Sequence, residues 1–465
     1  MRRLSIVAAV AASTLLAAPV ALPMALTAPA AAATGPITLD GTLPDGAKYR
    51  LEVPANWNGT LLLWSHGYRF GSSNPAETSP SPAMGAALLG QGYALAGSGY
   101  ASTGWALDSA VPDQLATVQQ FVTQVGQPRR SIAWGASLGG LVTGSLLDAA
   151  PRQFDGAVPL CGVLDPIGSW NQGLDAMFVV KTLLAPGADL PIVRITNPLA
   201  GLVTGYQVLD AAQATAAGRA RIAFAAAVGA VPTWVDPAVP EPAPLDFDAQ
   251  ERTQYTAFRS STLPFAFLGR AELEARAGGV YSWNTGVDYT RQLLRSPNLP
   301  QVAALYQQAG LSLSDDLAAL GRAPRIAADV AAVDYLARNH EPTGQLSVPV
   351  LAVHTTGDPL VVPSQERAYA TFVHRAGDTG LLRQVFTHRA GHCNFTGGEL
   401  VAALHAMESR LDAGHWGDLT SPEVLNAVAA AAVPGPVAPA YLDYQPALPA
   451  RLGCVPADQR YRPAC

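Results

Sequence analysis

Lysine is nearly missing from this chain of 465 residues, which contains only Lys48 and Lys181. Charged residues of both signs make up 14% of the sequence, and no cluster of lysine and arginine and no stripe of interleaved aromatic and basic residues occurs along it. A protein that binds nucleic acid needs such a basic surface to meet the phosphates. We therefore expect no nucleic acid among its partners.

Long apolar runs are missing as well, except near the N-terminus, so we expect no later segment to span a membrane. The chain begins with two arginines after Met1, continues with an apolar run from about position 4 to position 20, and reaches three alanines ending at Ala33. This order is that of a secretory signal peptide. A membrane anchor is the alternative, but Pro19 and Pro23 interrupt a run that is short for a span. We expect cleavage after Ala33 and an extracellular protein.

Cysteine is scarce, and its four positions are Cys161, Cys393, Cys454 and Cys465. An even number of cysteines in an exported chain favours disulfides, and three pairings are open. We favour Cys454 with Cys465, as a short clip on the C-terminal tail, and Cys161 with Cys393.

What the sequence does contain is a Gly-x-Ser-x-Gly pattern formed by Gly135, Ser137 and Gly139. A short apolar run at 131–134 precedes the pattern, and an apolar spacing typical of a helix follows it as far as Pro151. Strand, sharp turn and helix in this order present the serine oxygen at the end of a sheet, and the small residues let strand and helix pack closely beneath a strained turn. Ser137 is therefore the candidate nucleophile.

Strands and helices alternate on both sides of this pattern. Alternating polar and apolar residues predict strands at 37–43 and 49–53, and further strands are expected at 60–64, 92–98, 157–161, 348–354 and 381–387. An amphipathic helix is expected from Pro112 to Val125, with the proline at its start. This alternation predicts an α/β fold with a mostly parallel central sheet and helices on both faces.

The apolar strand 60–64 runs into Ser65-His66-Gly67-Tyr68, and together with the serine turn this arrangement resembles the α/β-hydrolase superfamily. Two backbone N–H groups in that family form an oxyanion hole, which stabilises the negative charge that develops on the carbonyl oxygen. The resemblance implies that the N–H groups of Tyr68 and Leu138 are these donors. The alternative is that His66 and Gly67 only end the strand in a turn.

The same resemblance implies an acid partner in the loop after strand 348–354. Asp358, in a Gly-Asp turn of that loop, is the expected acid. Its competitors are Asp165, one strand earlier, and Glu366, which we expect to face solvent on a helix.

The general base is expected in the loop beyond the last strand. His392 follows a glycine there, whereas its rival His388 lies nearer the strand and lacks a flanking glycine. Ser137, Asp358 and His392 then follow one another in the chain order of the family.

The resemblance covers roughly 37–165 and 348–410, and the segment between them is different. Residues 166–346 contain long Ala-rich helical segments, such as 211–228 and 326–338, and proline-rich loops. The family commonly carries a cap at this position. We divide the chain into a signal peptide (1–33), a core in two parts (34–165 and 347–415), a helical cap (166–346) and a C-terminal strap (416–465).

Six aromatic residues of the cap could line an acyl pocket or simply form the core of the cap. They are Trp170, Trp234, Phe265, Phe267, Tyr281 and Trp283.

His392 and Cys393 resemble the His-Cys half of a motif in tannase and feruloyl esterase enzymes, where a disulfide ties the catalytic serine and histidine loops together. In those enzymes the partner cysteine directly precedes the serine, and that position is Ala136 here. Cys161 could serve instead, from the end of the strand next to that of the serine, if the histidine loop leans over the intervening strand.

These residues predict a secreted hydrolase of carboxylic esters that works through a Ser-His-Asp triad and an acyl-enzyme, without metal or cofactor. Its partner would be a small-molecule or polymeric ester. The alternative is a serine peptidase of the same fold, which needs a cap carboxylate to hold a substrate amine. Asp246, Asp248 and Glu251 are available, although they are typical of a solvated helix start. A binding protein on a scaffold that no longer catalyses is a third alternative. Acyl preference and oligomeric state are left open.

Overall fold

The computed structural model describes residues 36–340, 342–433 and 435–453. The predicted signal peptide and the predicted clip between Cys454 and Cys465 lie outside the described residues. Within the described ranges, no helix is both long enough and apolar enough to cross a membrane.

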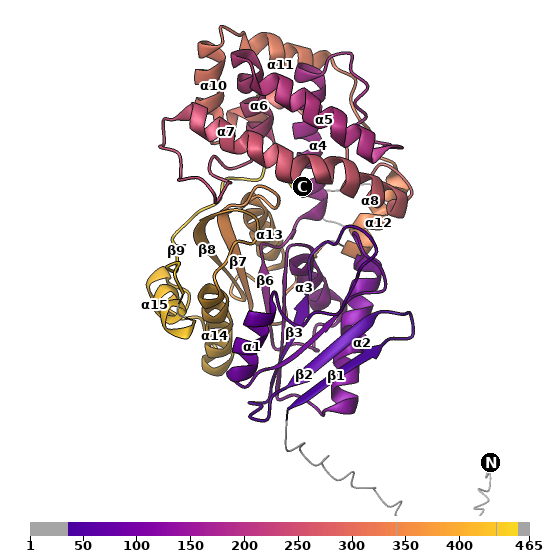
Figure 1. Cartoon of the computed structure of the whole chain (residues 1–465), viewed down its shortest axis with the longest axis vertical. Coiled ribbons are helices and arrows are strands. Elements are labelled where there is room, and N and C mark those ends of the chain that lie inside the picture. Colours follow the sequence, from indigo (N-terminus) through magenta and orange to yellow (C-terminus); the bar gives the residue numbers. More distant parts are fainter. Residues whose placement is uncertain (1–35, 341, 434, 454–465) are drawn as a thin grey trace, which may run out of the picture. The chain divides into compact units, whose positions relative to one another are not determined.

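A sheet forms the centre of the described chain, with its strands in the spatial order β1-β2-β4-β3-β5-β6-β7-β8-β9 (Figure 1). The six strands from β4 to β8 in this order are parallel, whereas β1, β2 and β9 pair antiparallel at the two edges. The predicted α/β fold with a mostly parallel sheet is therefore confirmed. The strands are β1 (Ile37–Thr42), β2 (Lys48–Val53), β3 (Thr60–Ser65), β4 (Ala94–Ser98), β5 (Arg130–Ala136), β6 (Gly156–Leu160), β7 (Val350–Gly357), β8 (Leu382–Ala390) and β9 (Tyr441–Leu442).

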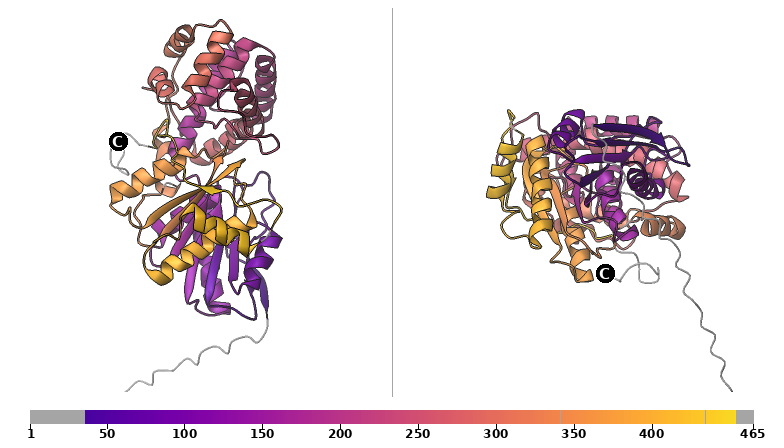
Figure 2. Two further views of the ribbon diagram at one scale, coloured as in Figure 1. Left: turned by 90° about the vertical axis from the view of Figure 1, so that its left-hand side faces the viewer. Right: turned by 90° about the horizontal axis from the view of Figure 1, so that it is seen from below.

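Helices cover both faces of the sheet, because successive side chains of a strand point to opposite faces (Figure 2). On β5, Ala133 belongs to the hydrophobic cluster of one face, and Ile132 and Trp134 belong to the cluster of the other. The first face packs against α2 (Leu107–Gln124), α3 (Leu138–Ala149), α12 (Val330–His340) and α13 (Ser364–Ala376). The second packs against α1 (Pro82–Gly90), α14 (Gly397–Ala413) and α15 (Pro422–Ala432).

Between β6 and β7 the described residues form helices and π-helical turns but no strand. Most of these helices gather beyond one end of the strands and have a hydrophobic cluster of their own, in which Phe224, Phe258 and Tyr306 are buried (Figure 1). The predicted domain boundaries stay predictions. Besides α12, the elements are α4 (Pro166–Val179), η1 (Val180–Leu184), α5 (Pro198–Gln213), α6 (Ala216–Val228), α7 (Phe247–Ala257), η2 (Phe258–Thr262), η3 (Phe265–Gly269), α8 (Arg270–Ala277), α9 (Tyr289–Leu294), α10 (Leu299–Gln308) and α11 (Leu313–Arg322).

The helix expected to start at Pro112 begins earlier. Helix α2 starts at Leu107, so the proline lies inside it. Leu107 and Ala110 are buried against the core, which extends the packed face toward the N-terminus. A proline removes one hydrogen bond of the helix ladder, here the bond to the carbonyl of Asp108. The burial of Leu107 and Ala110 outweighs the lost hydrogen bond, and the predicted start of the helix at Pro112 was wrong.

The predicted helical segment 211–228 is divided between two helices. Helix α5 ends at Gln213 and α6 starts at Ala216. The side chain of Thr215 accepts a hydrogen bond from the N–H of Gly218, and this cap separates the two helices.

The C-terminal segment contacts both the cap and the sheet. After β9 pairs with β8, the chain reaches Arg451, whose Nη1 donates to the backbone oxygen of Trp283 at 2.6 Å and to Oδ2 of the buried Asp175 at 3.4 Å. The N–H of Gly453 donates to Oδ2 of Asp165 at 2.9 Å. The tail therefore supplies the charge partner of a carboxylate inside the cap.

Candidate active site

Ser137 lies in the turn between β5 and α3, with φ 60° and ψ −121°. This backbone region is unfavourable for a residue with a side chain and costs about 1–3 kcal/mol, so the surroundings must impose it. Glycines allow the close packing that does so. A Cβ on Gly135 would lie 2.6 Å from the backbone oxygen of Ser65, and a Cβ on Gly139 would overlap the same atom. The turn has the strained geometry that the sequence pattern predicts.

The loop after β3 lies directly over the serine. A Cβ on Gly67 would be 3.4 Å from Cβ and 3.9 Å from Oγ of Ser137, so a larger residue there would crowd the nucleophile. Tyr68 and Leu138 line the same pocket as Ser137. Within the described part of the chain, their N–H groups donate to no other group of the protein. Both donors are therefore free to meet an anionic oxygen beside the serine.

His66 supports this loop as a neutral residue. Its ring stacks on that of Tyr100, with 4.0 Å between the centroids. Burial, together with the nearby positive charge of Arg69, lowers the pKa of His66 to about 4. The ring is thus uncharged near neutral pH and acts by packing.

Asp358 follows β7 and its side chain is completely buried. Oδ1 accepts hydrogen bonds from the N–H groups of Leu360 and Val361, each at 2.9 Å. Oδ2 accepts a hydrogen bond from Nδ1 of His392 at 2.7 Å. These three donors hold the carboxyl group of Asp358 in one orientation.

His392 lies in the loop after β8, and two hydrogen bonds hold this loop against β7. The N–H of Gly391 donates to the backbone oxygen of Gly357 at 2.9 Å, and the hydroxyl of Thr355 donates to the backbone oxygen of Gly391 at 2.8 Å. With Nδ1 bound to Asp358, Nε2 is the nitrogen that can accept a proton. The side chain of His392 is 23% exposed, so a substrate can reach it.

A disulfide joins Cys161, which directly follows β6, to Cys393, which directly follows His392. The two Cα atoms are 5.5 Å apart although β7 lies between β6 and β8, so the two loops converge over the end of β7. This is the pairing that the sequence analysis favoured.

The bridge holds the histidine loop close to the serine turn. The N–H of Ser137 donates to the backbone oxygen of Leu160 at 3.0 Å, and the bridged Cys161 is the next residue. The described residues show no hydrogen bond between Ser137 and His392. Such catalytic hydrogen bonds are often long without substrate and shorten when it binds.

The same loops contain a compact group of potential metal ligands, formed by His392 and the two cysteines. The disulfide occupies both sulfur atoms. This group is therefore part of the serine site and forms no metal centre in the bridged protein.

The rivals considered for the triad have other partners. Asp165 caps α4, where its Oδ1 accepts a hydrogen bond from the N–H of Gly168 at 2.9 Å. His388 is largely exposed, and its Nε2 lies 2.9 Å from Oε2 of Glu241 in a loop of the cap. Among the histidines that the structure describes, only His392 forms a hydrogen bond with Asp358.

The expectation that Glu366 faces solvent was wrong. It lies on a helix, α13, but its side chain is 1% exposed. Oε1 lies 3.0 Å from Nδ1 of His354, and Oε2 accepts a hydrogen bond from Gln384 at 2.6 Å. These partners come from β7 and β8, so α13 turns this carboxylate toward the sheet.

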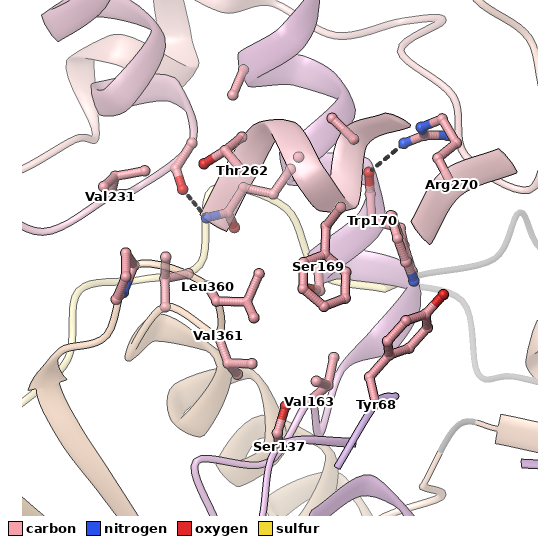
Figure 3. A pocket seen from close by; sticks show the side chains of 18 of the residues that line it. Tyr68, Ser137, Val163, Ser169, Trp170, Val231, Thr262, Arg270, Leu360 and Val361 are labelled. Carbon is pink, nitrogen blue, oxygen red and sulfur yellow. Dashed lines mark hydrogen bonds between the residues drawn. The ribbon is translucent and has the colours of Figure 1, made fainter. Parts of the chain in front are cut away.

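A pocket opens beside the serine (Figure 3). Ser137 and Tyr68 lie at one end of it and Thr262 lies at the other (Figure 3). Arg270 is the single charged side chain among the described residues that line it. Most of the wall is apolar and comes from Tyr68, Trp105, Val163, Trp170, Phe265, Leu360, Val361 and Val362.

The six aromatic residues of the cap are divided between the two predicted roles. Trp170 and Phe265 line the pocket, whereas Phe267 and Tyr281 are fully buried in hydrophobic clusters. The ring of Trp234 lies 5.3 Å from that of His388. The guanidinium group of Arg451 lies 5.5 Å from the ring of Trp283.

Sequence analysis did not identify Trp105, Arg270 or the residues that follow Asp358 as pocket residues. Leu360 and Val361 could have been suspected, because they belong to the loop of the expected acid. Trp105 and Arg270 carry no pattern in the sequence, since α2, α8 and the loop before α2 meet only in the fold.

The cap carboxylates considered as anchors for a substrate amine do not line the pocket. Asp246 caps α7, and Asp248 lies 4.0 Å from Arg219. Glu251 is buried rather than solvated, which corrects the expectation for that residue, and burial raises its pKa to about 7. All three have roles within the cap.

Three comparisons with known proteins bear on this site. Residues 85–176 match the model of the prolyl oligopeptidase family. The chain is 31% identical over 428 residues to the o-phthalyl amidase of Xanthobacter agilis, and the match covers 85% of this chain and 91% of that protein.

Two solved structures are also similar. An esterase from Aspergillus oryzae is 14% identical with a TM-score of 0.40, covering 82% of this chain and 79% of that one. Feruloyl esterase B from Aspergillus oryzae is 14% identical with a TM-score of 0.39, covering 82% and 81%.

Replacing both bridged cysteines, Cys161→Ser with Cys393→Ser, should lower the free energy of unfolding. The bridge closes a loop of 232 residues. Loss of a native disulfide typically costs about 2–5 kcal/mol. Urea unfolding of the two proteins measures the difference.

A thiol-free reductant provides the control for this pair. It should destabilise the natural protein more than the double variant, which keeps only Cys454 and Cys465. Equal stability of the two proteins under oxidising conditions would mean that the bridge does not hold the loops together.

Proposed function

Because the chain belongs to the α/β-hydrolase superfamily, in the family of the o-phthalyl amidase, and is a serine hydrolase, we propose that it hydrolyses carboxylic esters of small aromatic acids, and the corresponding amides more slowly. The observation that carries this proposal is the hydrogen-bonded pair of Asp358 and His392, tied by the disulfide to the loop beside Ser137.

The proposed reaction starts with proton transfer from Ser137 to Nε2 of His392. A serine hydroxyl is a weak nucleophile near neutral pH, and the histidine makes attack on the carbonyl carbon possible. Asp358 keeps the proton on Nδ1 and stabilises the imidazolium that forms. Its burial and its 2.7 Å bond to His392 suit this role.

The tetrahedral intermediate carries a negative oxygen, which the free N–H groups of Tyr68 and Leu138 would stabilise. His392 then gives its proton to the leaving group, and the acyl group stays on Ser137 until water, activated by the same histidine, releases the acid. An alcohol leaves more readily than an amine. An enzyme of this type that cleaves an amide therefore also cleaves the ester of the same acid.

The pocket supports a compact aromatic acyl group. Trp105, Trp170 and Phe265 supply flat apolar walls within reach of the serine, and aromatic rings pack favourably edge to face against such walls. The name of the curated relative also contains an aromatic acyl group, phthalyl, and it names an amide bond. Both points favour an aromatic acid over a long aliphatic chain.

An aminopeptidase is less well supported. Recognition of a substrate amine needs a carboxylate in the pocket, and the charged side chain that lines it in the described structure is a cation, Arg270. Arg270 is itself buried and lies 3.7 Å from Oε1 of Glu274, and the described residues that line the pocket include no carboxylate to hold a protonated amine.

The substrate class is tested with nitrophenyl esters and nitroanilides that share the same acyl groups. We expect benzoyl esters to be hydrolysed faster than octanoyl esters, and each ester faster than its anilide, because the leaving alcohol needs less help. Ser137→Ala should lower kcat by at least about 10⁴-fold. Steady-state rates of the mature protein provide the comparison.

Ser145→Ala is the matched control, since Ser145 is a buried serine of α3 that does not line the pocket. It should keep its activity. Preference for aminoacyl anilides over all esters would replace this proposal by a peptidase, and activity that survives in Ser137→Ala would remove the proposed nucleophile.

We also propose that the protein is exported. The signal-like sequence up to Ala33 supports this, and so does the disulfide between Cys161 and Cys393, because structural disulfides persist in oxidising compartments. The intact mass of protein recovered from the culture medium of a bacterium expressing the full chain should correspond to an N-terminus at Thr34. Protein that stays in the cytoplasm with Met1 would contradict export.

A further inference from the structure

His354 is a completely buried histidine of β7 that has no part in the acyl transfer proposed above. Its ring is held at both nitrogens. Nδ1 lies 3.0 Å from Oε1 of Glu366, and Nε2 lies 2.7 Å from the backbone oxygen of Val361.

The protons of these two contacts can be counted. A backbone oxygen only accepts, so Nε2 of His354 must donate to Val361. An ionised Glu366 also only accepts, so Nδ1 must donate as well. A neutral imidazole has one N–H group and cannot do both. The geometry therefore fits an imidazolium paired with a carboxylate, and the competing arrangement is a neutral ring with the proton on Glu366.

The surroundings of Glu366 favour the charged pair. The amide of Gln384, on β8, donates to its other carboxylate oxygen at 2.6 Å. Burial opposes a charged ring, but Glu366 and Asp358 nevertheless raise the pKa of His354 above that of an ordinary histidine. These two carboxylates are the titratable groups that face the ring in the described part of the chain. Tyr369 lies near Glu366, and burial raises its pKa, so it stays neutral.

The ring of His354 acts on Asp358 in two ways. Its Nε2 lies 3.7 Å from Oδ2 of Asp358, the oxygen that also bonds to His392. It also stabilises the turn after Asp358. The backbone oxygen of Val361 accepts a hydrogen bond from His354, and the N–H of Val361 donates one to Oδ1 of Asp358. The charged form of His354 would thus place a positive charge beside Asp358 and also hold the turn that follows Asp358.

We propose that His354, charged and paired with Glu366, is a positioning residue that keeps Asp358 ionised and in place and keeps His392 available as a base at lower pH. The proposal rests on the proposed roles of Asp358 and His392. A second positive charge beyond Asp358 disfavours protonation of His392. Removing that charge should therefore shift the activity of the enzyme toward higher pH.

The test is the pH dependence of kcat/KM for a nitrophenyl benzoate in the double variant His354→Gln with Glu366→Gln. This variant removes both charges, so no buried charge is left unpaired. The acid limb should move to higher pH, because Nε2 of His354 faces Asp358 whereas Glu366 lies on the Nδ1 side of the ring, so the removed positive charge is the one beside the triad acid. kcat should fall more at acid than at alkaline pH, while KM changes little.

His405→Gln is the matched control. His405 is a partly buried histidine of α14 that makes one hydrogen bond, to Gln91 at 3.1 Å. Its removal should leave the acid limb in place. A double variant that loses activity equally at every pH, or whose acid limb moves to lower pH, would make His354 a structural residue and overturn the proposal.

The charge of His354 is measured without reference to catalysis by ¹⁵N NMR of the histidine rings in the natural protein, with His354→Gln used for assignment. Both ring nitrogens should stay protonated through neutral pH, and a ring with one bare nitrogen there would overturn the proposal. Hydrolysis that survives in Ser137→Ala would instead contradict the proposed function, and this result does not depend on the charge of His354.

Discussion

The disulfide between Cys161 and Cys393 is the contact on which the geometry of the site depends. Ser137, Asp358 and His392 follow three different strands, and β6 and β7 separate the strand of the serine from that of the histidine. Hydrogen bonds to β7 hold the start of the histidine loop at Gly391, but they do not connect this loop to the serine turn. The covalent bridge crosses β7 and brings the histidine loop back toward the serine turn, with 5.5 Å between the Cα atoms.

This convergence requires unfavourable backbone at three points. Ser137, Cys161 and Cys393 all have positive φ, at 60°, 42° and 52°. Residues with side chains adopt this region only where the surroundings impose it, at a cost of about 1–3 kcal/mol each. The glycine contacts beneath the serine and the bond between the sulfur atoms impose it here. Two of these positions therefore lie in the loops of Ser137 and His392, and the third, Cys161, lies in the loop after β6 that is bridged to the histidine loop.

Much of the core could be predicted, because its determinants are local in the sequence. The strands β5, β7 and β8 end in chemically distinctive turns, so Ser137, Asp358 and His392 could be named as candidates from short motifs. The pairing of Cys161 with Cys393 could also be favoured, although only the fold shows that the loops converge over β7.

The rest depends on packing between distant segments. From the sequence alone, Glu366 is expected to face solvent on a helix. Nothing near it in the sequence indicates that α13 turns this side chain toward His354 and Gln384. Trp105 and Arg270 meet at the pocket only because the cap folds over the sheet. The start of α2 was misplaced for a similar reason, because burial of Leu107 outweighs the local signal of Pro112.

The central claim is that Ser137 is made nucleophilic by His392 and by no other histidine. The most direct measurement is the rate at which a fluorophosphonate probe labels the protein, with the modified residue located by mass spectrometry. We expect a single adduct on Ser137, formed at least about 10³-fold more slowly in His392→Gln and at an unchanged rate in His388→Gln. An adduct on another residue, or equal labelling of the natural protein and His392→Gln, would contradict it.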